Sequence, residues 1–143
     1  MADPTRSYEI DPTRVKEGAQ VAAGFTALTK MCGSVLDAIL ASVDAIPLHL
    51  RLLLFGVRRA AAARFPDAQL SAVGGILFLR FITPALVAPQ SCGVWDHALP
   101  TLAQRGLLLC SKVLQALANN AQFTGVKESY MQTMNGEARS TAI

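Results

Sequence analysis

Apolar residues recur along the first third of the chain at steps of three and four, the spacing that places side chains on one face of an α-helix. The series follows a polar lead and comprises Val21, Phe25, Leu28, Cys32, Val35, Ile39, Val43 and Ile46. No run of alternating apolar and polar residues in the sequence is long enough to indicate a sheet. The pattern predicts a long amphipathic helix and an all-α fold, an irregular helical bundle.

Prolines divide the chain that follows. Pro47 is predicted to end the first helix and to open a second one, which runs through Leu52 and Phe55. We expect a solvated basic face on this second helix, formed by Arg51, Arg58, Arg59 and Arg64. Phe65-Pro66-Asp67 then predicts a helix stop, with Asp67 capping the next helix.

The third predicted helix is apolar on nearly all sides, and we therefore expect it to be central in the bundle. Its apolar positions include Leu70, Val73, Leu77 and Phe81, and the pair Gly74-Gly75 would let another helix approach closely. A fourth helix is predicted to carry Leu107, Cys110, Leu114 and Leu117 on one face and to end near Asn119-Asn120. A short helix is expected within 123–134.

One cation interrupts the apolar third helix. Arg80 lies in its middle, and a guanidinium that stays charged needs hydrogen-bond acceptors wherever it is buried. Pro84 follows and removes a helical hydrogen bond, which predicts a kink. Two interpretations stay open: an arginine that reaches the surface or holds loop carbonyls for structural reasons, and one that organises a neighbouring loop for function.

Composition narrows the classes of function. The 143 residues fit one domain or part of a larger one, and 52% hydrophobic against 16% charged residues indicate a folded chain. A net charge of +3 with scattered lysines and arginines disfavours nucleic-acid binding. Charges and prolines interrupt the apolar stretches, so no transmembrane segment is expected. The polar N-terminus has no signal-peptide core, and we expect a cytoplasmic protein.

The cysteines and histidines have no metal-ligand spacing. Cys32, Cys92 and Cys110, with His49 and His97, form neither CxxC nor HxxxH motifs, and we expect free thiols, no metal site and no cofactor. Cys92 and His97 could be imagined as a nucleophilic pair, but nothing else in the sequence supports one.

The segment around Arg80, Phe78-Leu79-Arg80-Phe81-Ile82-Thr83-Pro84-Ala85, resembles the FLRFxxPA signature of Ras GTPase-activating (RasGAP) domains. Upstream segments resemble the neurofibromin-like branch of that family: Tyr8-Glu9-Ile10-Asp11-Pro12, Pro47-x-x-Leu50-Arg51 and Arg64-Phe65-Pro66. Downstream, the resemblance continues through Arg105-Gly106-Leu107, Ser111-Lys112-Val113-Leu114-Gln115 and Phe123-Thr124-x-x-Lys127-Glu128. It indicates a partial RasGAP domain over 1–135 and a frayed or unrelated tail over 136–143.

This resemblance implies a regulator of a small GTPase, not an enzyme with its own substrate. The implied partner is a Ras-type small GTPase in its GTP-bound state. In the family, the arginine at the position of Arg80 braces the loop that carries the catalytic arginine finger and helps to order the catalytic switch of the GTPase. The implied GTPase-binding residues are Phe78, Leu79, Pro84, Ala85, Lys112, Gln115, Asn119 and Lys127. The partner or the parent protein could also recruit the chain to the inner face of the plasma membrane.

No segment before Arg80 resembles the finger loop itself. The resemblance therefore implies the C-terminal portion of the helical domain, which would be inactive alone and would expose apolar faces meant for other helices. Three hypotheses remain: part of a working GTPase activator, a binding-only module similar to the IQ-motif-containing GAP relatives, and a plain helical scaffold.

Overall fold

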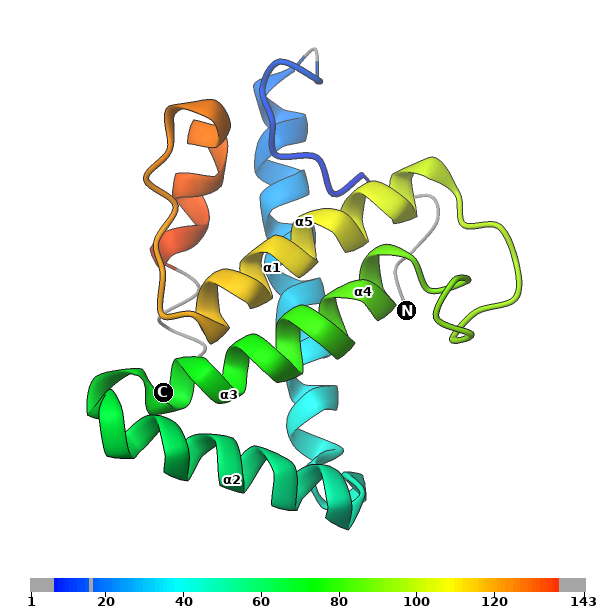
Figure 1. Cartoon of the computed structure of the whole chain (residues 1–143). Helices are drawn as coiled ribbons and strands as arrows, with labels where there is room; N and C mark the ends of the chain where they lie inside the picture. The colour runs from blue at the N-terminus through cyan, green and yellow to red at the C-terminus, as the bar shows by residue number, and fades with distance from the viewer. Residues whose placement is uncertain (1–6, 16, 137–143) are drawn as a thin grey trace.

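The computed structural model describes residues 7–15 and 17–136, and this part of the chain is all-α, without a β-strand (Figure 1). Its α-helices are α1 (Gly18–Ala41), α2 (Leu48–Arg64), α3 (Gln69–Leu77), α4 (Thr83–Val87) and α5 (Thr101–Ala118). Three short 3₁₀ segments accompany them: η1 (Val43–Ala45), η2 (Pro66–Ala68) and η4 (Val126–Thr133). A π-helical turn, η3 (Phe78–Ile82), joins α3 to α4. The all-α expectation is confirmed.

The helices cross instead of forming a parallel bundle. α3, η3 and α4 form one continuous rod that lies beside α5, and α1 crosses behind both (Figure 1). α2 lies alongside α3 at one edge of the molecule, and the segment that contains η4 lies at the opposite side of α5 (Figure 1). This arrangement leaves α2 with a large outward surface.

The core lies where α1 crosses α5, and it is closed by the N-terminal segment and η4. Its buried members are Ile10, Leu28, Cys32, Leu109, Cys110, Val113, Leu114, Met131 and Met134. The prediction that the apolar third helix is central is wrong, because neither α3 nor η3 contains a buried residue. Leu70 in α3 is 68% exposed.

Helix ends follow the prolines only in part. Pro47 immediately precedes α2, as predicted, but α1 ends at Ala41 and η1 intervenes. Asp67 does not cap α3, because it lies inside the 3₁₀ turn η2 and Ala68 occupies the position before the helix. The predicted tail, except for Gly136, lies outside the described residues.

Three glycines permit close packing of other segments against their helices. A Cβ at Gly24 would lie 2.0 Å from the carbonyl oxygen of Glu9, and one at Gly106 would lie 2.7 Å from the Tyr8 ring. A Cβ at Gly74 would lie 2.8 Å from the carbonyl oxygen of Ala118, which confirms the predicted close approach of another helix at this glycine. The first two glycines let the N-terminal segment lie directly on α1 and α5.

Length and composition alone would let two helical stretches of the described chain cross a membrane, Gly18–Ala41 and Pro66–Val87. Core helices of water-soluble proteins meet the same criteria, and α1 places Leu28 and Cys32 in the core. The expectation of no transmembrane segment therefore stays a prediction.

Candidate functional site

The signature segment coincides with a change in helical hydrogen bonding. The N–H of Thr83 donates to the carbonyl of Phe78, five residues back, so η3 is one π-helical turn. Pro84 follows in the first turn of α4, where its missing N–H is tolerated, and the helix continues until the N–H of Ala88 donates to the Pro84 carbonyl at 2.9 Å. Turns of this kind are frequent at functional sites, and this one carries Arg80.

Arg80 is exposed. Within the described part of the chain, no hydrogen bond or ion pair engages its guanidinium. Acceptors within the fold would be needed only if this cation were buried, and Arg80 instead reaches the surface, which is one of the two interpretations left open above. Its N–H donors are therefore available to a partner.

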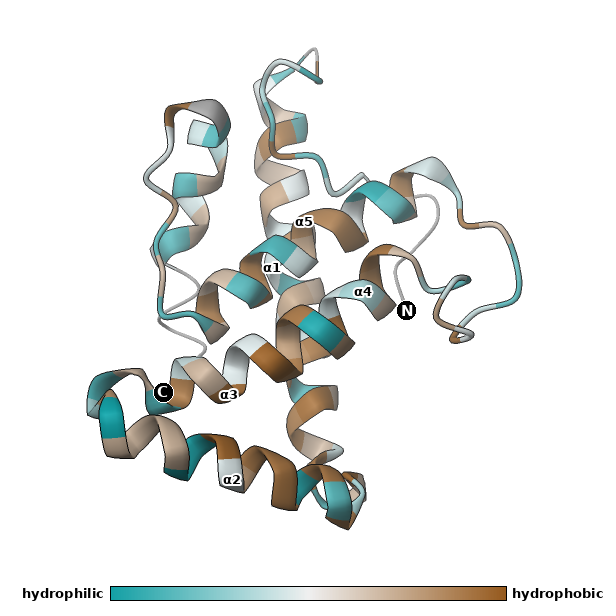
Figure 2. Ribbon diagram, in the orientation of Figure 1, coloured by the Kyte–Doolittle hydropathy of each residue, from teal (hydrophilic) through white to brown (hydrophobic). Residues whose placement is uncertain are grey.

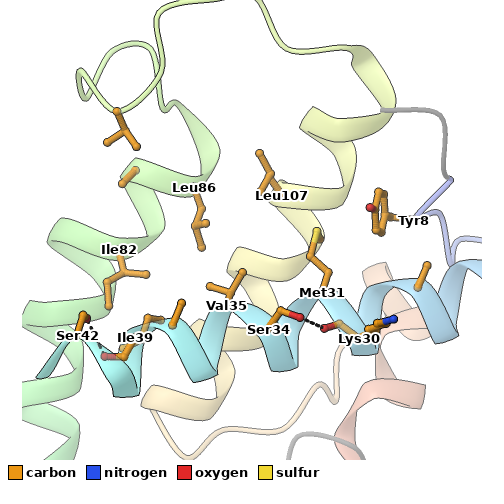
Figure 3. Close-up of a pocket in the computed structure, with 14 residues that line it drawn as sticks. Tyr8, Lys30, Met31, Ser34, Val35, Ile39, Ser42, Ile82, Leu86 and Leu107 are labelled. Carbon is orange, nitrogen blue, oxygen red and sulfur yellow. Dashed lines mark hydrogen bonds between the residues drawn. The ribbon is translucent and has the colours of Figure 1, made fainter. Parts of the chain in front are cut away.

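The other predicted contacts on this rod point in different directions. Leu79 is 43% exposed. Phe78 is half-buried against the core between α1 and α5. Ala85 lines a groove of about 640 Å³ between α1 and α4, together with Ile82 and Leu86 (Figure 3). Pro84 is half-buried. Of these residues, Leu79 is the one that shares the exposure of Arg80.

Three of the implied GTPase-binding residues, Lys112, Gln115 and Asn119, lie along the C-terminal half of α5 and at its end. Lys112 and Gln115 are half-buried, and Asn119 follows the last helical residue and is exposed. The ammonium of Lys112 pairs with Glu128 in η4, and both side chains are partly exposed, at 32% and 41%. This lysine holds the pKa of Glu128 below its usual value. Lys127 lies in η4 by its backbone, but its side chain is outside the description.

A chain of polar contacts extends from this pair across the molecule. The Tyr130 hydroxyl donates to Glu128 Oε1 at 3.3 Å, and Arg105 Nη2 donates to the Tyr130 oxygen at 3.5 Å. Arg105 also donates to both carboxylate oxygens of Glu9, from Nε at 2.9 Å and from Nη2 at 3.1 Å. The N-terminal segment, α5 and η4 are thereby tied together, and Lys112 is at one end of the chain.

Glu9 is ionised in this setting although it is buried. Burial is the largest single influence and opposes its charge, but Arg105 and the N–H groups of Asp11 and Ile10 together outweigh it and lower the pKa of Glu9. Glu9 and Arg105 belong to separate motifs of the sequence, and their pairing could not be predicted because 96 residues separate them and no periodicity links them.

The cysteines and histidines that the sequence singled out lie apart from any candidate metal site in the described residues. No group of three or more His, Cys, Asp or Glu side chains in this part of the chain could hold a metal ion. All three cysteines are free, and Cys92 is exposed. The pKa of the Cys32 thiol lies well above its ordinary value, mainly because of its hydrogen bond with Cys110 and also because it is buried. The His97 ring packs edge-on against Trp95, with 6.1 Å between the ring centroids.

The sequence matches the family described as GTPase-activator protein for Ras-like GTPase over residues 2–119, more than half of the chain. The chain belongs to the RasGAP family. Arg80, Leu79, Lys112 and Asn119 all lie within the matched residues. The η4 segment lies beyond them, so the role expected for Lys127 depends on the short motif alone.

Relatives of the RasGAP chain carry names of the same kind. Probable Ras GTPase-activating-like protein ngap of Dictyostelium discoideum is 33% identical over 133 residues, which cover 91% of this chain and 15% of that protein. Ras GTPase-activating protein 3 of Bos taurus is 33% identical over 131 residues, 88% of this chain and 16% of that protein. RasGAP-activating-like protein 1 of Mus musculus is 35% identical over 114 residues, with coverages of 76% and 14%. The chain thus spans about a sixth of the length of these relatives.

Proposed function

We propose that this chain supplies the finger-bracing part of a GTPase-activating domain, which binds the switch regions of a GTP-bound Ras-type small GTPase. Arg80 braces the arginine-finger loop. The observation that supports this role is that Arg80 is exposed on a π-helical turn inside the family signature. Leu79 provides apolar contact beside it. The stimulated hydrolysis takes place on the GTPase, so the chain is a regulator of an enzyme and needs no cofactor of its own.

Electrostatics suit such a partner. Arg80 is unpaired among the described residues, and Lys112 is partly exposed near the end of a polar network that fixes its position. Positive groups of this kind accelerate encounter with an acidic surface and set its register. An arginine supplied in trans to phosphoryl transfer raises kcat by about 10³–10⁵, and Ras with its activators is itself the reference case for that figure.

The remaining features of the proposal rest on the sequence motifs. The finger arginine comes from a segment outside these 143 residues, so the chain alone accelerates hydrolysis little. The domain ends near residue 135, and the chain lies in the neurofibromin-like branch, for which Pro47-x-x-Leu50-Arg51 and Arg64-Phe65-Pro66 are the support. Its place is the cytoplasm, and its partner or parent protein recruits it to the inner face of the plasma membrane.

The remaining GTPase-binding residues of the proposal rest on the family motifs, and they are Phe78, Pro84, Ala85, Gln115, Asn119 and Lys127. The exposed Asn119 contacts the GTPase, and the half-buried members hold the surrounding surface in shape. Substitutions at exposed positions should therefore mainly weaken binding to the GTPase, and substitutions at half-buried positions should mainly lower the free energy of unfolding.

Binding to a GTPase loaded with a GTP analogue or with GDP and aluminium fluoride tests the proposal. We expect the Arg80→Ala variant to bind about 10-fold more weakly or worse, because it loses charge-assisted hydrogen bonds worth about 1.5–3 kcal/mol. Arg14→Ala is the matched control, since Arg14 is a 61% exposed arginine at the other end of the chain. Equal binding by Arg80→Ala and wild type would refute the role of Arg80, and no binding even when the preceding helices are restored would indicate a plain helical scaffold.

The finger is tested separately. A longer protein that contains the preceding residues should stimulate hydrolysis, whereas these 143 residues should bind without doing so. Binding without stimulation by the longer protein would identify a binding-only module.

A further inference from the structure

One face of α2 is apolar and points outward. Leu48, Leu52 and Phe55 recur at steps of four and three and are 59%, 58% and 63% exposed. The half-buried residues Leu50 and Leu54 lie on the other side of the helix, where α3 packs. Hydrophobic colour runs along α2 at this edge of the molecule (Figure 2).

The same helix carries charge of one sign. Four exposed arginines, Arg51, Arg58, Arg59 and Arg64, and no acidic residue occur in α2. At about 100° per residue, Arg51 and Arg58 fall on one flank of the apolar stripe, and Arg59 continues the stripe toward the C-terminal end. Arg58 Nε donates to Gln69 Oε1 at 3.1 Å, which fixes that side chain along the flank.

We propose that α2 docks this chain onto an anionic lipid bilayer. Leu48, Leu52 and Phe55 enter the boundary between headgroups and acyl chains, and Arg51, Arg58 and Arg59 bind lipid phosphates. An exposed apolar stripe flanked by arginines is the arrangement with which helices lie in the plane of an anionic interface. The solvated basic face expected from the sequence is then a lipid-binding face.

Charge favours a lipid surface over a second copy of this helix. If two α2 helices packed through their stripes, the arginines of one would face those of the other, with no carboxylate in either helix to compensate. An anionic bilayer supplies negative charge along the whole stripe. Since α2 contains none of the proposed GTPase-binding residues, lipid docking and GTPase binding can fail independently.

Sedimentation with vesicles tests the charge. We expect binding to phosphatidylcholine vesicles that contain roughly 30% phosphatidylserine, weaker binding at high salt, and little binding to phosphatidylcholine alone. The triple change Arg51→Gln, Arg58→Gln and Arg59→Gln should reduce partitioning about 100-fold, since each arginine contributes roughly fivefold. Arg14→Gln is the control and should change little. Undiminished binding by the triple variant would overturn the proposal.

The apolar stripe is tested by fluorescence. In a Trp95→Phe background, Phe55→Trp places the only tryptophan on the stripe, and its emission should shift to the blue and be quenched by brominated lipids on anionic vesicles. Leu52→Gln should weaken binding, whereas Val126→Gln, at a residue that is 94% exposed elsewhere, should not. Because these side chains are exposed, circular dichroism should show unchanged helicity.

Two results would show that the apolar stripe of α2 binds something other than a lipid bilayer. If Leu52→Gln converted a dimer into a monomer in sedimentation velocity and left vesicle binding unchanged, the stripe would be an interface between copies. If wild type bound no vesicles of either composition, the stripe would belong to a protein contact.

Discussion

The ion pair between Glu9 and Arg105 offers the sharpest test of the structure. Both side chains are largely buried, 11% exposed for Glu9 and 19% for Arg105, and the guanidinium donates to both carboxylate oxygens. Glu9→Gln removes the charge and keeps the shape. The substitution leaves the guanidinium of Arg105 without its counter-charge.

The expected loss is about 2 kcal/mol in the free energy of unfolding at pH 7. Removing one partner of a fully buried pair costs about 3–5 kcal/mol. Arg105 keeps some contact with water, and glutamine retains one oxygen acceptor, so we place the loss below that range. For a chain of this length, 2 kcal/mol corresponds to a Tm lowered by roughly 6 °C.

The effect should depend on pH in a stated direction. The folded pKa of Glu9 lies below its ordinary value of 4.5, so the ionised carboxylate stabilises the fold above that value. As the pH falls through the lower, folded pKa, the carboxylate takes up a proton and this stabilisation is lost. The difference between wild type and Glu9→Gln is therefore full at pH 7 and shrinks below about pH 4.

Urea unfolding followed by circular dichroism at pH 7 and pH 3 measures both quantities. Glu17→Gln is the control, because it makes the same chemical change at an exposed residue. A loss smaller than about 0.5 kcal/mol at pH 7, or an equal loss at both pH values, would refute the ion-pair argument.

Three further substitutions test the packing and the site. Gly24→Ala should destabilise by more than about 2 kcal/mol, because its Cβ would lie 2.0 Å from the Glu9 carbonyl oxygen. Gly33→Ala, with nothing within 4 Å, should stabilise by roughly 0.5–1 kcal/mol in the same thermal melts, and similar effects at the two glycines would contradict the structure. Lys112→Ala should cost under about 1 kcal/mol, since its pair with Glu128 is partly exposed, and should weaken GTPase binding several-fold; a stability loss of several kcal/mol without weaker binding would make Lys112 a purely structural residue.

The helices could be predicted from the sequence because their signals are local. Steps of three and four predicted α1 and α5, and Pro47 marked the start of α2. The faces that become buried could not be predicted in the same way. Leu28 and Leu52 belong to similar apolar stripes, yet Leu28 is fully buried and Leu52 is 58% exposed. The difference is whether another helix packs there, and that depends on distant parts of the chain.

The candidate site was predictable in its motif and not in its contacts. The residues around Arg80 were recognised as a signature, but the helical rod continues through Pro84, where a kink was predicted (Figure 1), and the π-turn before it had no sequence signal of its own. The pairing of Lys112 with Glu128 and of Arg105 with Glu9 requires residues far apart in sequence to meet. Polar residues along one face of a helix indicate that this face is exposed, but they do not identify the residues with which they pair.

Two exposed faces of this molecule differ in chemistry, and the difference separates the partners that we propose for them. On the rod of α3, η3 and α4, one unpaired cation, Arg80, lies among apolar neighbours such as Leu79 and Phe81, which are 43% and 52% exposed. A single guanidinium with fixed backbone geometry suits directional hydrogen bonds to one protein loop. On α2, several arginines flank an apolar stripe. This arrangement suits a fluid anionic lipid surface, whose headgroups can move to meet the arginines. If both proposals hold, Arg80→Ala weakens GTPase binding and leaves vesicle binding intact, and the arginine substitutions on α2 do the reverse.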